Sequence, residues 1–249
     1  MTRWKASGLH LTISIAIAAS ALACMLLVWY PGPLFQAAGG NGLLFLLVGV
    51  DVVVGPLITL IVFRSGKPGM KFDLAMIALA QSAALAYGVH TVYLARPVFI
   101  VFVKDRFDVA RAVDISDADL AQGKYPQFRA FPLGRPRLAF VDWPDDPKER
   151  AKLVDLAFSA SATDLYQLPR LFVPYEERTK EVLKRAYPVE RVRQIEPKAA
   201  DVIDRYLARS GRPPDSVRFL DLRAPLAWVA VLVDAKTAQP VEMLIYDSL

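Results

Sequence analysis

Charge is missing from most of the N-terminal part of this chain. Between Lys5 and Asp51 there is no Asp, Glu, Lys or Arg. A helix needs about 20 apolar residues to cross the hydrocarbon core of a bilayer. Three segments of the sequence reach that length, at residues 9–29, 43–63 and 74–95. The first is longer than the roughly 7 to 15 apolar residues of a cleaved signal peptide, so the sequence predicts a transmembrane domain of three helices over residues 1–95.

Basic residues near the ends of these spans predict the orientation, because cytoplasmic loops retain Lys and Arg. Arg3 and Lys5 precede the first span, and three basic residues lie in the 64–73 loop, whereas the 31–42 loop has none. The N-terminus is therefore predicted to be cytoplasmic. Three crossings then place residues 96–249 on the far side of a lipid bilayer, and in a Gram-negative bacterium this means an inner-membrane protein whose residues 96–249 form a periplasmic domain.

Cysteine and histidine are scarce as well. Cys24 is the one cysteine of the chain and lies in the first predicted span, so no disulfide can form within the chain. The two histidines, His10 and His90, lie near opposite faces of the membrane in this topology and cannot share a metal ion, so each is expected to be an interfacial or packed residue. Residues 96–249 contain neither residue type. Ser-His-Asp hydrolases, cysteine proteases, thiol oxidoreductases and ordinary zinc sites are therefore excluded from this part.

The predicted periplasmic domain shows no other chemical signature. It has 25 basic and 23 acidic residues, a balance that argues against a nucleic-acid partner. It has neither a phosphate-binding glycine loop nor a Ser-x-x-Lys spacing. Neighbouring carboxylates fit helix caps or solvated faces better than a catalytic acid and base; they are Asp117 and Asp119, Asp145 and Asp146, and Glu176 and Glu177. We predict no catalytic residue, no cofactor and no metal, and hence no enzyme.

From residue 96 onward the sequence alternates strand and helix signals. Runs of β-branched and aromatic residues predict strands at residues 98–103, 109–115, 138–143, 217–222, 226–233 and 241–246. The polar residues 104–108 separate the first two strands, and residues 234–240 are expected to join the last two as a hairpin. Between the third and fourth strands, Pro147, Pro174 and Pro197 each predict the first turn of a helix. The first of these helices is expected to end near Ser159 and the last at Gly211. This order predicts an α+β domain with a mainly antiparallel sheet.

Asp51 is the most informative polar residue of the predicted spans. It lies about eight residues into the second span, roughly 12 Å deep at 1.5 Å per residue. An unpaired charge at that depth is costly and usually functional, so we expect Asp51 to be protonated or to have a polar partner across the bundle. By depth, the candidate partners are His90 and Tyr87 on the third span and Ser20 on the first.

Two interpretations of Asp51 stay open. In one, its side chain recognises the membrane helix of a partner or relays a proton. In the other, it makes a hydrogen bond inside the bundle that fixes the packing of the three helices. An intramembrane aspartyl protease would need a second carboxylate, and Asp73 lies at the cytoplasmic edge. One turn after Asp51, Gly55 and Pro56 predict a helix kink, because proline lacks a backbone donor.

Several short motifs of the N-terminal half resemble a known family. They are WKASG at 4–8, WYPGP at 29–33, GVDVVVGPLITL at 49–60, KFDLA at 71–75, ARPVF at 95–99 and DRF at 105–107. Together they resemble the TfpX/TfpZ family of type IV pilin accessory proteins. The resemblance implies an inner-membrane factor that assists assembly or display of a type IV major pilin, alongside other pilus-assembly components, and that is not an enzyme.

Three classes of function are compatible with these features. A chaperone-like pilin accessory factor is the leading hypothesis. The alternative is an envelope sensor whose periplasmic domain reads a ligand, although the predicted cytoplasmic segments are too short to carry an output module. A membrane enzyme is the third class, and the missing His and Cys in the domain leave little room for it.

Overall fold

A computed structural model describes residues 2–157 and 163–248, and the chain divides into two compact units. The first unit comprises Met1–Trp29 and Gly39–Ala95. The second comprises Tyr30–Ala38 and Arg96–Leu249. The short segment between the first two helices therefore belongs to the same unit as the C-terminal domain, from which it is distant in sequence.

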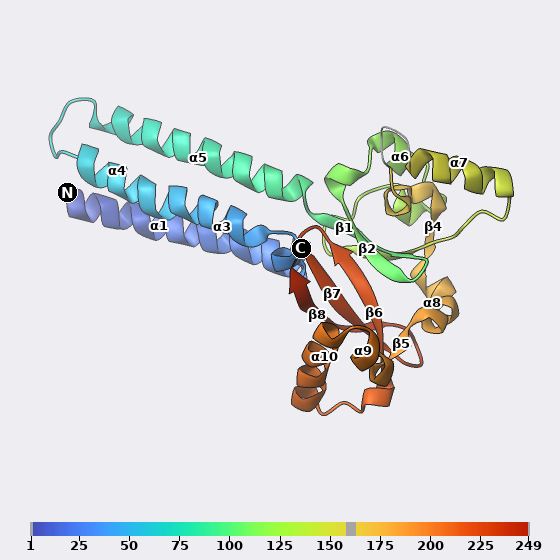
Figure 1. The fold of residues 1–249 in the computed structure, drawn as a ribbon. Coiled ribbons are helices and arrows are strands. Elements are labelled where there is room, and N and C mark those ends of the chain that lie inside the picture. The colour runs from blue at the N-terminus through green and yellow to red at the C-terminus, as the bar shows by residue number, and fades with distance from the viewer. Residues whose placement is uncertain (1, 158–162, 249) are drawn as a thin grey trace. The chain divides into compact units, whose positions relative to one another are not determined.

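The first unit consists of three helical stretches that run alongside one another (Figure 1). They are α1 (Arg3–Cys24) with its π-helical continuation η1 (Met25–Trp29), then α3 (Gly40–Val48), η2 (Gly49–Val54, π-helical) and α4 (Gly55–Val62) in direct succession, and finally α5 (Met70–Leu94).

Two helices of the described residues, Arg3–Trp29 and Met70–Leu94, are long and apolar enough to cross a membrane. The prediction of three such helices is corrected on this point. The middle stretch is helical over much of the predicted 43–63 span, but among the described residues its apolar helix runs from Asp51 to Val62. That is shorter than the about 17 to 25 residues of a spanning helix.

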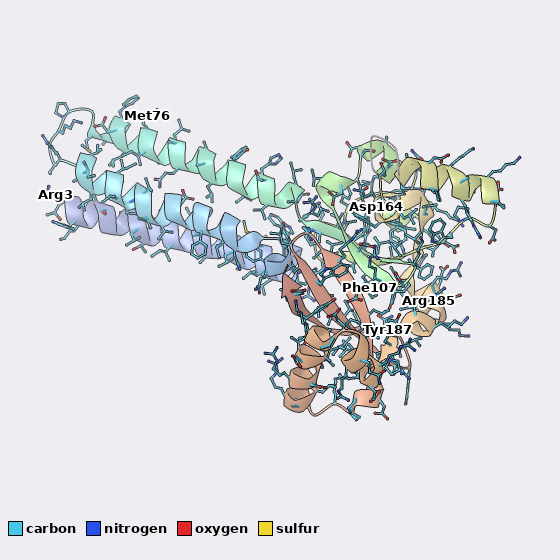
Figure 2. The ribbon with its side chains drawn as sticks, in the orientation of Figure 1. Arg3, Met76, Phe107, Asp164, Arg185 and Tyr187 are labelled. Carbon is cyan, nitrogen blue, oxygen red and sulfur yellow. The ribbon has the colours of Figure 1, made fainter. Side chains whose placement is uncertain are left out.

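Apolar side chains point outward from all parts of this unit. Phe45, Ile61 and Leu79 are largely exposed, and in Figure 2 side chains project along α1, α4 and α5, among them that of Met76. A surface of this kind is unfavourable in water and suits contact with lipid or with another apolar helix.

The second unit is built on a mixed sheet of eight strands. They are β1 (Pro97–Val103), β2 (Arg106–Arg111), β3 (Arg137–Val141), β4 (Phe172–Pro174), β5 (Tyr187–Pro188), β6 (Val217–Ala224), β7 (Ala227–Asp234) and β8 (Pro240–Ser248). The order is β4-β3-β1-β2-β6-β7-β8, and β5 pairs with β6. The β1–β3 and β2–β6 pairs are parallel and the others are antiparallel.

Short helices connect and cover the strands of this unit. The α-helices are α2 (Leu34–Ala37), α6 (Asp117–Ala121), α7 (Pro147–Ala157), α8 (Thr179–Arg185), α9 (Val189–Ile195) and α10 (Pro197–Ser210). The 3-10 turns are η3 (Ala112–Asp114), η4 (Pro126–Phe128), η5 (Leu165–Gln167), η6 (Pro169–Leu171), η7 (Tyr175–Arg178) and η8 (Pro214–Ser216).

The three proline signals for helices had different outcomes. Both α7 and α10 begin at their predicted prolines, and Gly211 ends α10 with a φ of 68°. The predicted end of α7 at Ser159 lies outside the described residues. The helix predicted at Pro174 is present but begins one residue later, as the 3-10 turn Tyr175–Arg178 followed by α8, because Pro174 itself is the last residue of β4 and pairs with Ala139. An edge strand such as β4 tolerates a residue without an N–H.

The predicted second strand is shifted. The polar residues after β1 were expected to form a loop before a strand at 109–115, whereas β2 begins at Arg106 and ends at Arg111. Lys104 adopts a positive φ of 59°, and Val103 pairs with Arg106. The turn between β1 and β2 is therefore tight, and the strand starts sooner than its composition predicts.

The segment Tyr30–Ala38 contributes to the core of the sheet domain. Leu34 and Ala37 are buried in one cluster with residues of β1, β6 and β7. The carbonyl oxygen of Ala37 accepts a hydrogen bond from the N–H of Leu226 at 2.9 Å. On the opposite face of the sheet, α9 and α10 cover a second cluster that includes Phe219 and Leu232. Both faces of the β6–β8 part are thus covered.

Candidate functional site

A line of polar side chains on α1 faces the middle helix. Ser7, His10 and Ser14 recur at intervals of three and four residues, which places them on one face of a helix. The hydroxyl of Ser7 donates to the carbonyl oxygen of Pro56 at 2.9 Å. Nδ1 of His10 lies 2.6 Å from Oγ1 of Thr59, within hydrogen-bond distance. These contacts fix α1 against α4 through polar groups in an apolar setting.

The predicted kink residues lie directly after a change in helical winding. The π-helical stretch η2 ends at Val54, and α4 begins with Gly55 and Pro56. Proline cannot donate a backbone hydrogen bond to the preceding turn, and π-type winding is one way in which a helix accommodates such an interruption. A Cβ atom on Gly55 would lie 1.8 Å from Nε2 of Gln81. Glycine at this position therefore lets the Gln81 amide rest against the helix.

A cavity of about 190 Å³ lies among the helices beside Asp51. Its polar lining comes from all three stretches, with His10 and Ser14 from α1, Asp51 from η2, and Gln81 and Ser82 from α5. The side chain of Asp51 is 7% exposed. Within the described residues, Oδ1 of Asp51 and both polar atoms of the Gln81 amide have no hydrogen-bond partner. Buried polar atoms without partners are costly, so this cavity is the candidate site of the helical unit.

The residues predicted to accompany Asp51 lie elsewhere. Ser20 donates its hydroxyl to the Ala16 carbonyl of its own helix at 2.8 Å. Tyr87 is 75% exposed, and His90 is also exposed. The partners were chosen by counting the depth of Asp51 from residue 43. The middle helical stretch begins earlier, at Gly40, so Asp51 lies near its centre.

Sequence reasoning missed the residues that line the cavity. His10 was treated as a packed or interfacial residue, and Ser14 and Gln81 were not singled out. The three-and-four spacing of Ser7, His10 and Ser14 was a usable signal, since it marks a polar stripe on an apolar helix. Gln81 had no such signal, because its role comes from its position opposite Gly55.

A buried charge cluster joins two strands of the sheet domain. Asp108 is 2% exposed, and its Oδ1 accepts a hydrogen bond from Nε of Arg223 at 2.7 Å. Nε of Arg106 lies 3.5 Å from Oδ2. Burial raises the pKa of the Asp108 carboxyl, and the two arginines oppose that rise. Because β2 and β6 are parallel neighbours, with Asp108 paired to Arg223, this cluster serves to join two strands. In the part of the chain that the structure describes, no group of three His, Cys, Asp or Glu side chains is placed to hold a metal ion.

Comparison with known proteins gives consistent matches to one family. Residues 1–39 match the family described as fimbrial assembly protein FimB. The serogroup I fimbrial assembly protein of Dichelobacter nodosus is 37% identical over 188 residues, 74% of this chain and 72% of the relative. The serogroup E1 protein is 35% identical with the same coverage. The protein of serogroups C1 and C2 is 37% identical over 120 residues, 47% of this chain and 92% of the relative. No solved structure matches the chain.

The fold and the site define a class of protein with apolar N-terminal helices, a polar cavity between them and a mixed-sheet C-terminal domain. The sequence identity of 35% and 37% to two relatives, over about three quarters of each chain, shows the family. This chain belongs to the fimbrial assembly protein family.

Proposed function

We propose that this chain is a non-catalytic accessory factor of the inner membrane that assists the assembly or surface display of a type IV pilin. The observation that carries the proposal is its 37% identity over 188 residues to a protein named for fimbrial assembly. The resemblance of residues 49–60 to the TfpX/TfpZ family points the same way. In this proposal the helices hold the membrane helix of the major pilin, and the sheet domain contacts the pilin outside the cytosol.

The position of residues 30–38 supports a three-crossing topology. These residues follow the first apolar helix directly, and Leu34 and Ala37 are part of the core of the sheet domain. The loop and the domain must therefore lie on the same side of the membrane. That requires the chain between Gly39 and Ala95 to cross the membrane an even number of times, by both the middle stretch and α5. With a cytoplasmic N-terminus, the sheet domain is periplasmic.

The unsatisfied atoms beside Asp51 favour recognition of a partner helix. If Asp51 acted only inside the bundle, its carboxyl and the Gln81 amide would be expected to bond to each other or to their neighbours, and the described residues show no such bond. Ala78 and Ser82 line the same cavity and are themselves exposed. We propose that a polar group of the pilin's membrane helix approaches this side of α5 and bonds with Asp51 or Gln81.

Deletion of the gene and complementation test the proposal. Without the protein, surface pili and pilus-dependent motility are expected to fall strongly while the pilin transcript stays constant, and a wild-type copy restores them. If pilin level, surface pili and motility stay unchanged, the proposal is wrong. If the pilin transcript changes first, the envelope sensor is the better explanation, because a sensor acts through expression.

A further inference from the structure

Among the strands that the structure describes, β8 lies at one end of the sheet and pairs only with β7. Backbone groups of a strand point alternately to its two sides, so an edge strand presents unpaired N–H and C=O groups outward. Register shifts interrupt its pairing with β7 near both ends. Between them, Glu242–Ile245 pairs regularly with Val229–Leu232. This regular stretch is suited to pairing with a further strand.

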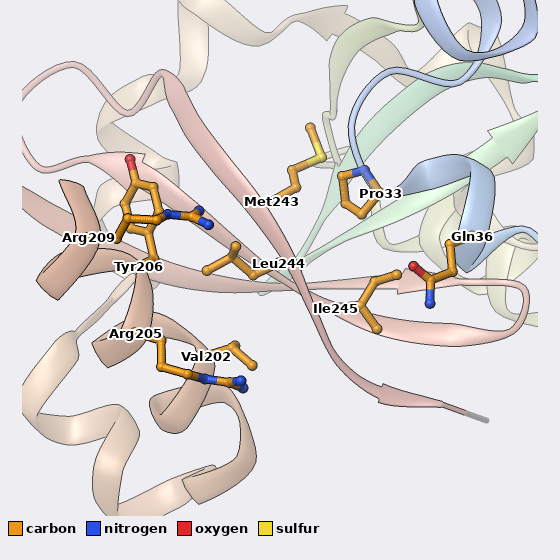
Figure 3. A pocket seen from close by; sticks show the side chains of 9 residues that line it. All are labelled: Pro33, Gln36, Val202, Arg205, Tyr206, Arg209, Met243, Leu244 and Ile245. Atoms are coloured by element: carbon orange, nitrogen blue, oxygen red, sulfur yellow. The ribbon is translucent and has the colours of Figure 1, made fainter.

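A cavity of about 530 Å³ lies along this part of β8 (Figure 3). Residues of α10, including Arg205, Tyr206 and Arg209, line one side, and Pro33 and Gln36 line the other. Met243, Leu244 and Ile245 of β8 lie between them. Leu244 packs with the cluster under α10, whereas Met243 and Ile245 pack with the cluster on the opposite face of the sheet. Because both faces contribute walls, the cavity lies over the open edge of the strand.

A second cavity of about 150 Å³ extends this space. It is lined by Pro31–Pro33 and by Pro240–Met243. The two cavities share Pro33 and Met243, so they form one groove along residues 240–245, which we call the edge groove. At about 3.3 Å per residue, six residues of β8 correspond to roughly 20 Å of extended chain.

The charge of the edge groove is positive on its α10 side. Arg205 and Arg209 are both exposed and lie one helical turn apart. Nε of Arg205 donates to the carbonyl of Asp201 at 3.2 Å. Among residues 2–157 and 163–248, neither arginine forms an ion pair. Glu242 lies at the other end of the groove, where its carboxylate accepts the N–H of Met243.

We propose that the edge groove docks an extended segment of another polypeptide as an additional strand beside β8, with an acidic side chain of that segment held by Arg205 and Arg209. Backbone hydrogen bonds supply the affinity of such strand addition, and side-chain contacts supply the specificity. The arginine pair adds charge-assisted bonds to a carboxylate. This inference concerns the chemistry of the ligand and holds whether or not that ligand is a pilin.

A second copy of this chain is a poorer occupant. Two β8 strands paired antiparallel are related by a two-fold axis through the sheet, which places both α10 helices on the same face. The arginines of the two copies then approach one another and repel.

Synthetic peptides of eight residues test the inference on the full chain in detergent. The first peptide alternates Val or Thr with Glu, and the second has Lys in place of Glu. The third and fourth peptides have the acidic sequence with N-methyl groups on alternate backbone nitrogens. In the third these groups lie along one edge of the extended peptide, and in the fourth they lie along the other edge. Fluorescence anisotropy is expected to show binding of the acidic peptide, at least tenfold weaker binding of the lysine peptide, and loss of binding for one N-methylated peptide but not for the other.

Matched variants separate the groove from general electrostatics. The double change Arg205→Glu and Arg209→Glu is expected to weaken acidic-peptide binding at least tenfold, whereas Arg212→Glu, exposed beyond the end of α10, leaves it unchanged. Equal binding of all four peptides, equal effects of the two variants, or no binding would overturn the inference. A protein that sediments as a dimer and binds no peptide would show that β8 pairs with a second copy, which also overturns it.

Discussion

At the scale of single residues, one buried oxygen of the Asp51 carboxyl group, Oδ1, lacks a hydrogen bond within the described residues. We expect Asp51→Asn to be mild, because an amide keeps the shape and the polar character of the side chain. We expect Asp51→Leu to lower the amount of protein in the membrane, because leucine leaves the Gln81 amide facing an apolar wall. Immunoblots of membrane fractions measure the difference.

Thr12→Ala is a suitable control for the Asp51 pair. Thr12 is an exposed α1 residue whose hydroxyl donates to the Gly8 carbonyl of the same helix. Its replacement is expected to leave abundance unchanged. If Asp51→Leu and Asp51→Asn both behave as the wild type does, the cavity has neither a structural nor a binding role.

The Asp108 cluster gives a stability prediction with a defined pH dependence. Arg223→Ala removes the nearest partner of a buried carboxylate and is expected to lower the free energy of unfolding by roughly 2 to 3 kcal/mol near neutral pH, below the full cost for a buried pair because Arg223 is partly exposed. Burial already raises the pKa of Asp108, and the variant raises it further. The charged form is the one penalised, so the loss is largest above that pKa and shrinks as the pH falls through it.

Denaturant unfolding of the full chain at pH 7.5 and pH 5 measures this effect. Arg212→Ala is the control, because Arg212 is exposed and makes no ion pair within the described residues. Its change is expected to stay within about 0.5 kcal/mol at both pH values. An Arg223→Ala loss that grows toward acid pH would show that Asp108 is not the group responsible.

At the scale of elements, the segment Tyr30–Ala38 should behave as part of the domain core. Leu34 is 2% exposed, and Leu34→Ala is expected to destabilise the domain by roughly 2 to 4 kcal/mol, the usual cost of a buried leucine. Leu226→Ala is the matched control, since Leu226 is 51% exposed. Thermal unfolding followed by tryptophan fluorescence distinguishes the two. Similar losses in both variants would mean that Leu34 does not pack in the core.

Local sequence signals predicted where elements begin and end better than they predicted which strands pair. The start of α10 at Pro197 and its end at Gly211 are determined by residues at those positions. The β7–β8 hairpin is also locally determined, because the side chain of Asp234 accepts hydrogen bonds from the N–H groups of Lys236 and Thr237 in its turn. Pro174 ends β4 and also precedes the helical stretch that begins at Tyr175, because a proline suits an edge strand as well as a helix start. The parallel pairing of β1 with β3 joins strands that are far apart in sequence, and no local pattern encodes it.

The sequence predicted the central residue of the candidate site, Asp51, but not the residues that line the cavity with it. The cost of a carboxyl in an apolar run singles out Asp51 from sequence alone. Its neighbours depend on where each helix begins and how its turns are wound, and the early start at Gly40 and the π-helical η2 change both. For this reason Gln81, and not His90, lines the cavity with Asp51.

At the scale of the whole molecule, the proposed topology makes a labelling prediction. In a Cys24→Ser background, single cysteines at Gln36 and at Lys236 are expected to react with a membrane-impermeant maleimide on intact spheroplasts. A cysteine at Ser65 should react only after lysis. All three parent residues are exposed. Labelling of Ser65→Cys in intact spheroplasts, or protection of Lys236→Cys, would contradict the three-crossing arrangement.

In the proposed function, this protein acts by direct contact with a pilin in the membrane. A photo-crosslinking amino acid at Leu79, which is 63% exposed on α5 and follows the cavity-lining residue Ala78, tests that contact in living cells. A covalent adduct that contains the pilin is expected, and its yield per amount of this protein should fall when Asp51→Leu is added. Irradiated cells in which Leu79 yields no pilin adduct, while pilin is present at its normal level, would contradict it.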